Sequence, residues 1–227
     1  MDPSRAPMPS LRSALTASGR DLAVAGTVFG WITVVLLTDA HGSLLTQRLL
    51  GVATWALLLG LGARETPLVR AQIGVVVVFA SAIEYTFSPL LHVYAYRFDN
   101  VPAYVPPGHG LVYLCALALG RCALAARWRR PLVALVLVLG GTWAVHGVLA
   151  ARPDALGAFW FCCLVFFLAF GRSRLVYVGA FWIVGYLELL GTHVGTWVWA
   201  THDPTGIVSI GNPPSGAAGG YGWFDLA

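Results

Sequence analysis

Seven runs of apolar residues, each close to 20 residues long, most constrain the fold of this chain. A helix rises 1.5 Å per residue, so about 20 residues cross the roughly 30 Å hydrocarbon core of a bilayer. Of the 227 residues, 58% are hydrophobic and 11% charged, and the mean hydropathy is +0.74. These values exclude an ordinary soluble domain and predict an integral membrane protein. The expected spans are residues 22–37, 44–63, 71–94, 110–126, 131–151, 155–171 and 175–200.

Arginine supplies all 14 cationic side chains, and its distribution predicts the orientation. With the N-terminus inside, eleven arginines fall on the cytoplasmic side, and only Arg48, Arg97 and Arg152 fall on the other. Cytoplasmic loops carry the excess of basic residues in membrane proteins. We therefore predict an all-α, polytopic bundle of seven transmembrane helices in the cell membrane, with the N-terminus inside and the C-terminus outside. Orientation also explains the pI near 9.1 without a nucleic-acid partner.

The composition divides the chain into three parts. Residues 1–20 are predicted to be a polar cytoplasmic tail, residues 21–200 the seven-helix transmembrane domain, and residues 201–227 a Gly/Pro-rich, aromatic outer tail. A signal peptide is the rival interpretation of the first span, but the leader is long and no small-residue cleavage site follows Leu37. Tyr221, Trp223 and Phe224 in the last part either anchor at the outer interface or fold back as a lid.

Two glutamates, Glu84 and Glu188, lie within apolar helices in the predicted outer half. A charge at such a depth costs about 2.5 kcal/mol or more, so it normally faces a partner or a wet cavity. A protonated glutamate that hydrogen-bonds another helix is the structural alternative. Each glutamate precedes an aromatic pair, in residues 94–96 and 197–199, and then an aspartate and a Pro-rich loop. This pattern indicates an internal repeat, although many helices leave a membrane through aromatic residues and prolines.

The third span places Glu84, Ser88 and His92 at helical spacings of four residues, which predicts one shared face. Pro89 removes a backbone hydrogen bond there and should kink or open the helix. A freed carbonyl is tolerated in a membrane only where protein or water satisfies it, so we expect a polar cavity near the outer surface. His109 follows a Pro-Pro-Gly sequence at that interface, where it can act as an acid or a base.

The seventh span carries Glu188, Gly191, Gly195, Trp197 and Trp199. Glycines four residues apart are typical of close helix packing. Over little more than this helix, the chain resembles the membrane-embedded carotenoid hydratases and the related lycopene cyclases. The resemblance implies a fold of seven or eight spans and protonation of a polyene double bond by a buried acid.

These features predict a membrane-embedded enzyme whose cavity opens toward the outer leaflet and performs acid/base chemistry on a hydrophobic lipid or isoprenoid. Glu84 and Glu188 would be the acid and base, because two neighbouring carboxyl groups in a dry site titrate apart. His92 and His109 would shuttle protons. An Arg97 to Asp99 ion pair is the alternative to a substrate role for that loop. The expected substrate contacts are Arg97, Asn100, Tyr94 and Trp197.

No cofactor is expected, because the sequence lacks HExxH and CxxC spacings, and a metal site would have to combine ligands from separate helices. The rival functions are a non-catalytic subunit of a larger membrane complex and a small transporter. A transporter should carry ionisable residues along a path to both faces, whereas the inner half has almost none. A single cavity that contains both glutamates would favour the enzyme over the subunit.

Overall fold

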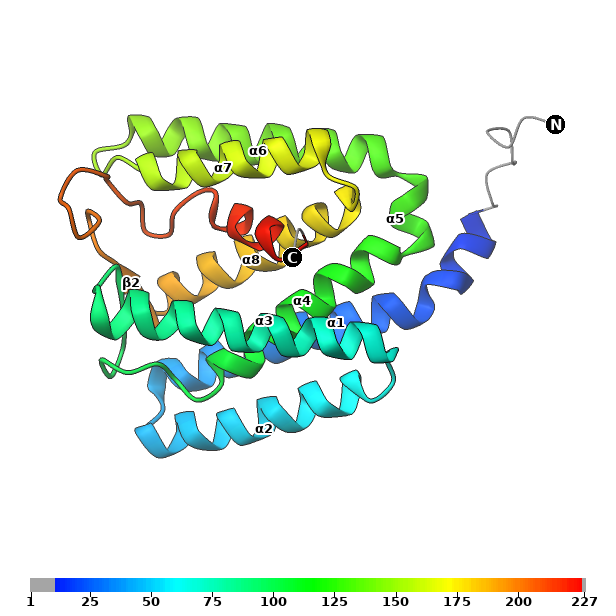
Figure 1. The fold of residues 1–227 in the computed structure, drawn as a ribbon, viewed down its shortest axis with the longest axis horizontal. Coiled ribbons are helices and arrows are strands. Elements are labelled where there is room, and N and C mark those ends of the chain that lie inside the picture. The colour runs from blue at the N-terminus through cyan, green and yellow to red at the C-terminus, as the bar shows by residue number, and fades with distance from the viewer. Residues whose placement is uncertain (1–10, 226–227) are drawn as a thin grey trace.

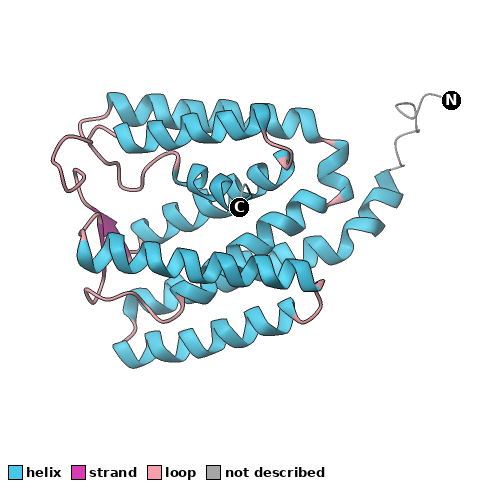
Figure 2. Cartoon of the chain, viewed as in Figure 1, coloured by secondary structure: helices cyan, strands magenta, loops and turns pink. Residues whose placement is uncertain are grey.

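The computed structural model describes residues 11–225 as a bundle of long helices with two short strands at one end (Figures 1 and 2). The elements in chain order are α1 (Leu11–His41), α2 (Leu44–Gly62), α3 (Pro67–Tyr85), the π-helical turn η2 (Thr86–Leu90), β1 (Tyr94–Tyr96), α4 (Val105–Arg121), α5 (Ala123–Arg127), α6 (Arg129–Leu149), α7 (Ala155–Phe170), α8 (Arg174–His193), β2 (Trp197–Trp199) and the 3-10 helix η3 (Ala217–Asp225).

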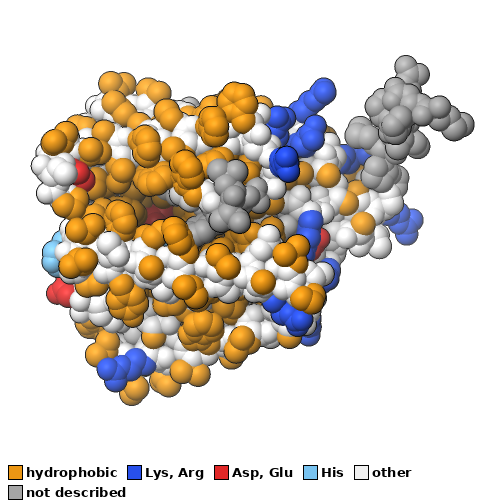
Figure 3. Space-filling model, in the orientation of Figure 1, with side chains coloured by type: hydrophobic (Ala, Val, Ile, Leu, Met, Phe, Trp, Pro, Cys, Tyr) orange, Lys and Arg blue, Asp and Glu red, His pale blue; other side chains and the backbone are white. Residues whose placement is uncertain are grey.

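Five helices of the described chain are long and apolar enough to cross a membrane: α1, α2, α3 with η2, α6 and α8. The predicted all-α membrane protein is therefore confirmed. Every predicted span overlaps a helix, but α7 has only 16 residues and α4 only 17. Large apolar side chains cover the outer surface, as lipid contact requires; Leu149 is 80% and Phe170 76% exposed. Figure 3 shows this apolar surface, with the basic side chains gathered mainly at one end.

Helix α4 is short because it forms the centre of the bundle. It packs against α1, α2, α3 and α8, and residues 110–116 are all buried. Prolines occupy its first turn, where the missing N–H has no intrahelical partner to lose. This turn places His109 at one end of the core, as the sequence predicted.

The third and seventh predicted spans both end in strands, which the sequence did not predict. Pro89 lies in the π-helical turn η2, so the expected opening of this helix is confirmed. The next segment leads through His92, at a positive φ of 52°, into β1. Helix α8 ends before Gly195, whose φ of 77° is readily adopted only by glycine. Both chains then extend, and β1 and β2 pair antiparallel (Figure 2).

The N-terminal part departs from the predicted tail. Residues 11–20 belong to α1 rather than to an irregular segment, and residues 1–10 lie outside the described part of the chain. Ser18 explains the difference, because it is fully buried and its hydroxyl accepts a hydrogen bond from the Leu124 N–H at 3.0 Å. The polar letters of this segment therefore include residues that join α1 to α5.

The C-terminal segment also differs from the expected outer tail, because η3 folds back along α7 and α8 (Figure 1). Gly216, Gly219 and Gly222 recur every three residues and so share one face of a 3-10 helix. A Cβ at Gly219 would lie 2.0 Å from the Trp160 carbonyl oxygen, and one at Gly222 would lie 2.1 Å from the Phe167 ring. The glycines therefore permit close packing on α7. This is the lid alternative, not the interfacial anchor.

Trp223 marks how far this segment returns into the bundle. Its ring packs edge-on against Phe167, with 5.4 Å between centroids. Phe167 lies 12 residues along α7 from Ala155, or about 18 Å at the helical rise. The side chain of Phe224, the third aromatic residue of the tail prediction, lies outside the described part.

Candidate active site

A cavity of about 630 Å³ lies between α1, α3, α4, α8 and the C-terminal segment. Its walls are almost entirely apolar and aromatic. Glu84, Glu188 and His109 are the ionisable acid and imidazole groups that line it. Figure 3 shows a hollow on this face between α3 and the C-terminal segment, with acidic atoms inside it. The cavity therefore combines a lateral, lipid-facing opening with a small acidic centre.

Glu84 is a buried carboxylate surrounded by donors. Its Oε2 accepts hydrogen bonds from the hydroxyls of Tyr94 and Tyr96, each at 2.9 Å. Burial, followed by the charge of Glu84, raises the pKa of both phenols above their ordinary value, so they remain donors. The other oxygen, Oε1, lies 2.8 Å from His109 Nε2. Three partners thus hold the glutamate from β1 and α4.

His109 extends this contact into a chain of three groups. Its Nδ1 lies 2.6 Å from the hydroxyl of Tyr221 in η3, and the two rings stack at 5.9 Å between centroids. When Glu84 is ionised, Nε2–H donates to the carboxylate and Nδ1 accepts from Tyr221. The order Tyr221, His109, Glu84 is therefore a proton relay that starts in the C-terminal segment.

Glu188 is held differently, although it is equally buried. Its Oε2 accepts from the indole N–H groups of Trp197 at 3.1 Å and Trp199 at 3.0 Å. Among the described residues, no donor contacts its Oε1. An indole N–H donates but cannot accept or exchange a proton at neutral pH. Glu188 therefore keeps one oxygen for whatever occupies the cavity.

The two glutamates are joined by the β1–β2 pair, whose register is symmetric about Ala95 and Val198. Tyr94 pairs with Trp199 and Tyr96 with Trp197. The first ring pair lies 4.7 Å apart and the second 6.0 Å apart. Each glutamate binds the aromatic pair that follows it in sequence, so the repeat seen in the sequence corresponds to two equivalent units.

Gly191 has a different role from the one its spacing suggested. A Cβ at this position would lie 1.9 Å from the Trp197 ring, so the glycine makes room for the indole that binds Glu188. Gly195 provides the turn into β2 and meets no neighbouring helix. The predicted close helix packing is therefore wrong for both.

Five of the eight predicted site residues line the cavity, namely Glu84, Glu188, His109, Tyr94 and Trp197. His92 does not, because the π-helical turn and its positive φ rotate it out of the Glu84 face and leave it exposed. Arg97 and Asn100 also lie outside the cavity lining.

Arg97 and Asn100 belong to a neighbouring polar cluster instead. Arg97 Nη2 lies 3.7 Å from Asp39 Oδ1, rather than forming the considered pair with Asp99, and the guanidinium covers the Phe98 ring at 4.2 Å. Asn100 donates to Gln47, which donates to Asp39 Oδ2 at 3.1 Å. Their positions fix this loop to α1 and α2, so the clamp for a substrate head group is not supported.

Sequence reasoning missed several residues of the site. Tyr104 donates to the fully buried Asp39 at 2.8 Å and also lines the cavity. Arg152, considered only for topology, donates to the carbonyls of Trp199 and Ala200, each at 2.7 Å, and so holds β2. Asp39 offered a signal, since it is an acid near the end of an apolar span. Arg152 offered none.

Within residues 11–225, no group of three or more His, Cys, Asp or Glu side chains is arranged to hold a metal ion. No protein-family model, curated protein or solved structure matches this chain.

Proposed function

We propose that this protein is a membrane-embedded enzyme that transfers protons to and from a carbon–carbon double bond of an apolar, isoprenoid-like lipid. The observation that carries the proposal is the pairing of Glu84 and Glu188 in one apolar cavity. One carboxyl group is surrounded by donors and connected to a relay, whereas the other keeps an oxygen facing the cavity.

Their surroundings support different roles for the two glutamates. Three donors favour the ionised form of Glu84, since hydrogen bonds to a carboxylate stabilise its charge. Glu188 receives both of its hydrogen bonds on one oxygen, so a proton on Oε1 can point at a bound molecule. Glu188 is therefore the proposed acid, and Glu84 with His109 is the proposed base.

The reaction balances without an external reductant or oxidant. Glu188 donates its proton to one carbon of the double bond, and the other carbon becomes cationic. The nearby faces of Trp197, Trp199 and Tyr94 would stabilise this charge by cation–π attraction. Glu84 then removes a proton, either from the adjacent carbon, which moves the double bond, or from a water that adds to the cation. Return of that proton to Glu188 completes the cycle.

The cavity lining supports an uncharged substrate. The lining residues include no arginine, and Arg97 lies outside, so nothing in the walls would neutralise an anionic head. The apolar lining also fits a long hydrocarbon that enters sideways from the bilayer. The proposal therefore contains no head-group clamp.

The proposed topology places this cavity in the outer half of the cell membrane. Seven spans with the N-terminus inside would put the arginine-rich end in the cytoplasm, in agreement with the basic side chains gathered at one end in Figure 3. Cysteines introduced at Ser10 and in the loop at Thr205 should then label from opposite sides of intact cells. Labelling of both from one side would contradict this orientation.

Solvent deuterium tests the proposed chemistry on a mixture of candidate lipids, so no single substrate has to be chosen. Protein in lipid nanodiscs that contain membrane isoprenoids is incubated in D₂O, and the lipids are then analysed by mass spectrometry. Proton transfer at carbon should introduce non-exchangeable deuterium into one isoprenoid. E84Q and E188Q should each abolish incorporation, and the double variant should be little worse, because residues that act as a unit are not additive.

The control is H92Q, which alters an exposed histidine outside the cavity and should retain full incorporation. If wild type and E188Q give equal deuterium contents for every lipid, the enzyme proposal fails. A non-catalytic subunit would then be the better explanation, and the buried glutamates would serve only to hold β1 and β2.

A further inference from the structure

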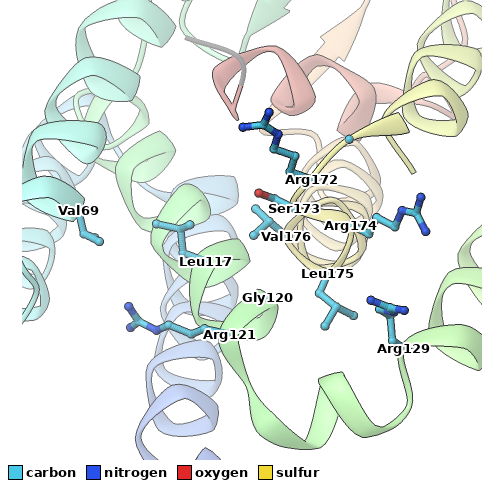
Figure 4. Close-up of a pocket in the computed structure, with 11 residues that line it drawn as sticks. Val69, Leu117, Gly120, Arg121, Arg129, Arg172, Ser173, Arg174, Leu175 and Val176 are labelled. Carbon is cyan, nitrogen blue, oxygen red and sulfur yellow. The ribbon is translucent and has the colours of Figure 1, made fainter. Parts of the chain in front are cut away.

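A second cavity lies at the opposite end of α4 from His109. It is a crevice of about 590 Å³ between α3, α4, the start of α6 and the loop that leads into α8. Figure 4 shows Arg172 and Arg174 on either side of Ser173 at the start of α8, with Arg121 on α4 and Arg129 on α6. Four arginines from three parts of the chain therefore line one crevice.

Most of this positive charge is not neutralised by the described residues. Arg121 is paired, because it donates to Asp21 at 2.7 Å and to both oxygens of Glu65 at 2.7 and 2.8 Å. Arg129 and Arg172 have no acidic partner within residues 11–225, and both are exposed. Two guanidinium groups at the mouth of the crevice are thus available to a ligand.

The start of α8 adds to this field. Ser173 occupies the N-cap position, but its side chain makes no capping hydrogen bond. The first N–H groups of a helix and its dipole favour an anion at that end. Behind the arginines, Val69, Leu117 and Val176 provide an apolar wall. The crevice is therefore basic at its mouth and apolar along its side.

We propose that this crevice binds the phosphate of an anionic phospholipid, with Arg129 and Arg172 on the phosphate oxygens and the first part of an acyl chain along the apolar wall. Guanidinium groups recognise phosphate through paired hydrogen bonds. Anionic lipids of a cytoplasmic leaflet also concentrate near basic side chains. The site is separate from the cavity of the proposed enzyme and does not depend on that function.

The test titrates detergent-solubilised full-length protein with phosphatidylglycerol, phosphatidylcholine or inorganic phosphate, and follows lipid occupancy by native mass spectrometry and the melting temperature. R129Q/R172Q should weaken phosphatidylglycerol binding about tenfold or more, since each charged hydrogen bond lost costs around that factor. R70Q/R130Q removes the same charge from exposed arginines outside the crevice. This control should change binding by less than about threefold.

The arms also distinguish the source of the phosphate. Competition between inorganic phosphate and phosphatidylglycerol, lost in R129Q/R172Q, supports phosphate as the recognised group. Phosphate binding without lipid binding would overturn the lipid proposal in favour of a soluble phosphate compound. Equal effects of the two double variants, or equal binding of phosphatidylglycerol and phosphatidylcholine, would also overturn it. Melting temperatures without ligand identify any variant that fails to fold.

Discussion

Replacement of Asp154 by alanine should release the C-terminal segment from the bundle. This aspartate precedes α7 and is 2% exposed. Its Oδ1 accepts from Gly157 N–H at 2.9 Å and Gly211 N–H at 2.8 Å, and its Oδ2 from Ser215 N–H at 2.7 Å. D154A leaves three buried donors without an acceptor, at about 1–3 kcal/mol each, so the loss should be roughly 3–6 kcal/mol if water reaches some of them. Typical total stabilities are about 5–15 kcal/mol.

Thermal unfolding in detergent and limited proteolysis of the C-terminal segment would measure this effect. D154N should be milder, because one oxygen can still accept from Gly157 and Gly211 while its amide faces Ser215. The matched control is D203A, since Asp203 also accepts from backbone N–H groups in this segment but lies outside the bundle core. It should change the melting temperature little. If D154A melts and resists protease like wild type, the three hydrogen bonds do not hold the segment.

Three further predictions concern the C-terminal segment and the arginine-rich end. G219A should lower the melting temperature, because its Cβ would lie 2.0 Å from a carbonyl oxygen and overpacking costs about 1–3 kcal/mol; G220A, with no atom within 4 Å of the added Cβ, should not. Y221F should leave the protein folded but strongly reduce deuterium incorporation, and unchanged incorporation would remove Tyr221 from the relay. The Arg121 hydrogen bond lowers the pKa of Glu65 below its ordinary 4.5, so this stabilisation should be complete above that value and lost as pH falls through the lowered pKa; the melting temperature of E65Q should vary less than that of wild type between pH 7 and pH 3.

Hydropathy was sufficient to predict the helices because lipid requires each backbone group to be satisfied within a helix. The same rule does not apply where protein surrounds the backbone. Residues 94–96 and 197–199 look like the ends of apolar helices, yet each strand satisfies the other. Their pairing depends on two segments that are about 100 residues apart, so no local pattern could predict it. Gly195 was a signal for the second break, but helix packing explained it equally well from sequence.

The candidate site was predictable where chemistry was exceptional and not where it depended on chain reversal. A buried glutamate is rare enough in a membrane helix to identify Glu84 and Glu188. Tyr221 carries no such signal, because an aromatic residue near an interface is common. Its position follows from glycines that lie on one face only in a 3-10 helix. A helical periodicity also placed His92 beside Glu84, but a π-helical turn changes the face of every residue after it.

The same turn explains an irregularity in the repeat. Tyr94 and Tyr96 follow Glu84 by ten and twelve residues, whereas Trp197 and Trp199 follow Glu188 by nine and eleven. A π-helical turn contains one residue more than an α-helical turn, so η2 absorbs this difference and both aromatic pairs reach their glutamate. Two parallel helices with a symmetric strand pair between them are therefore equivalent in backbone and different in chemistry. Tyrosines and a histidine surround one carboxyl group and donor-only indoles the other, which is the asymmetry that an acid and a base in one cavity require.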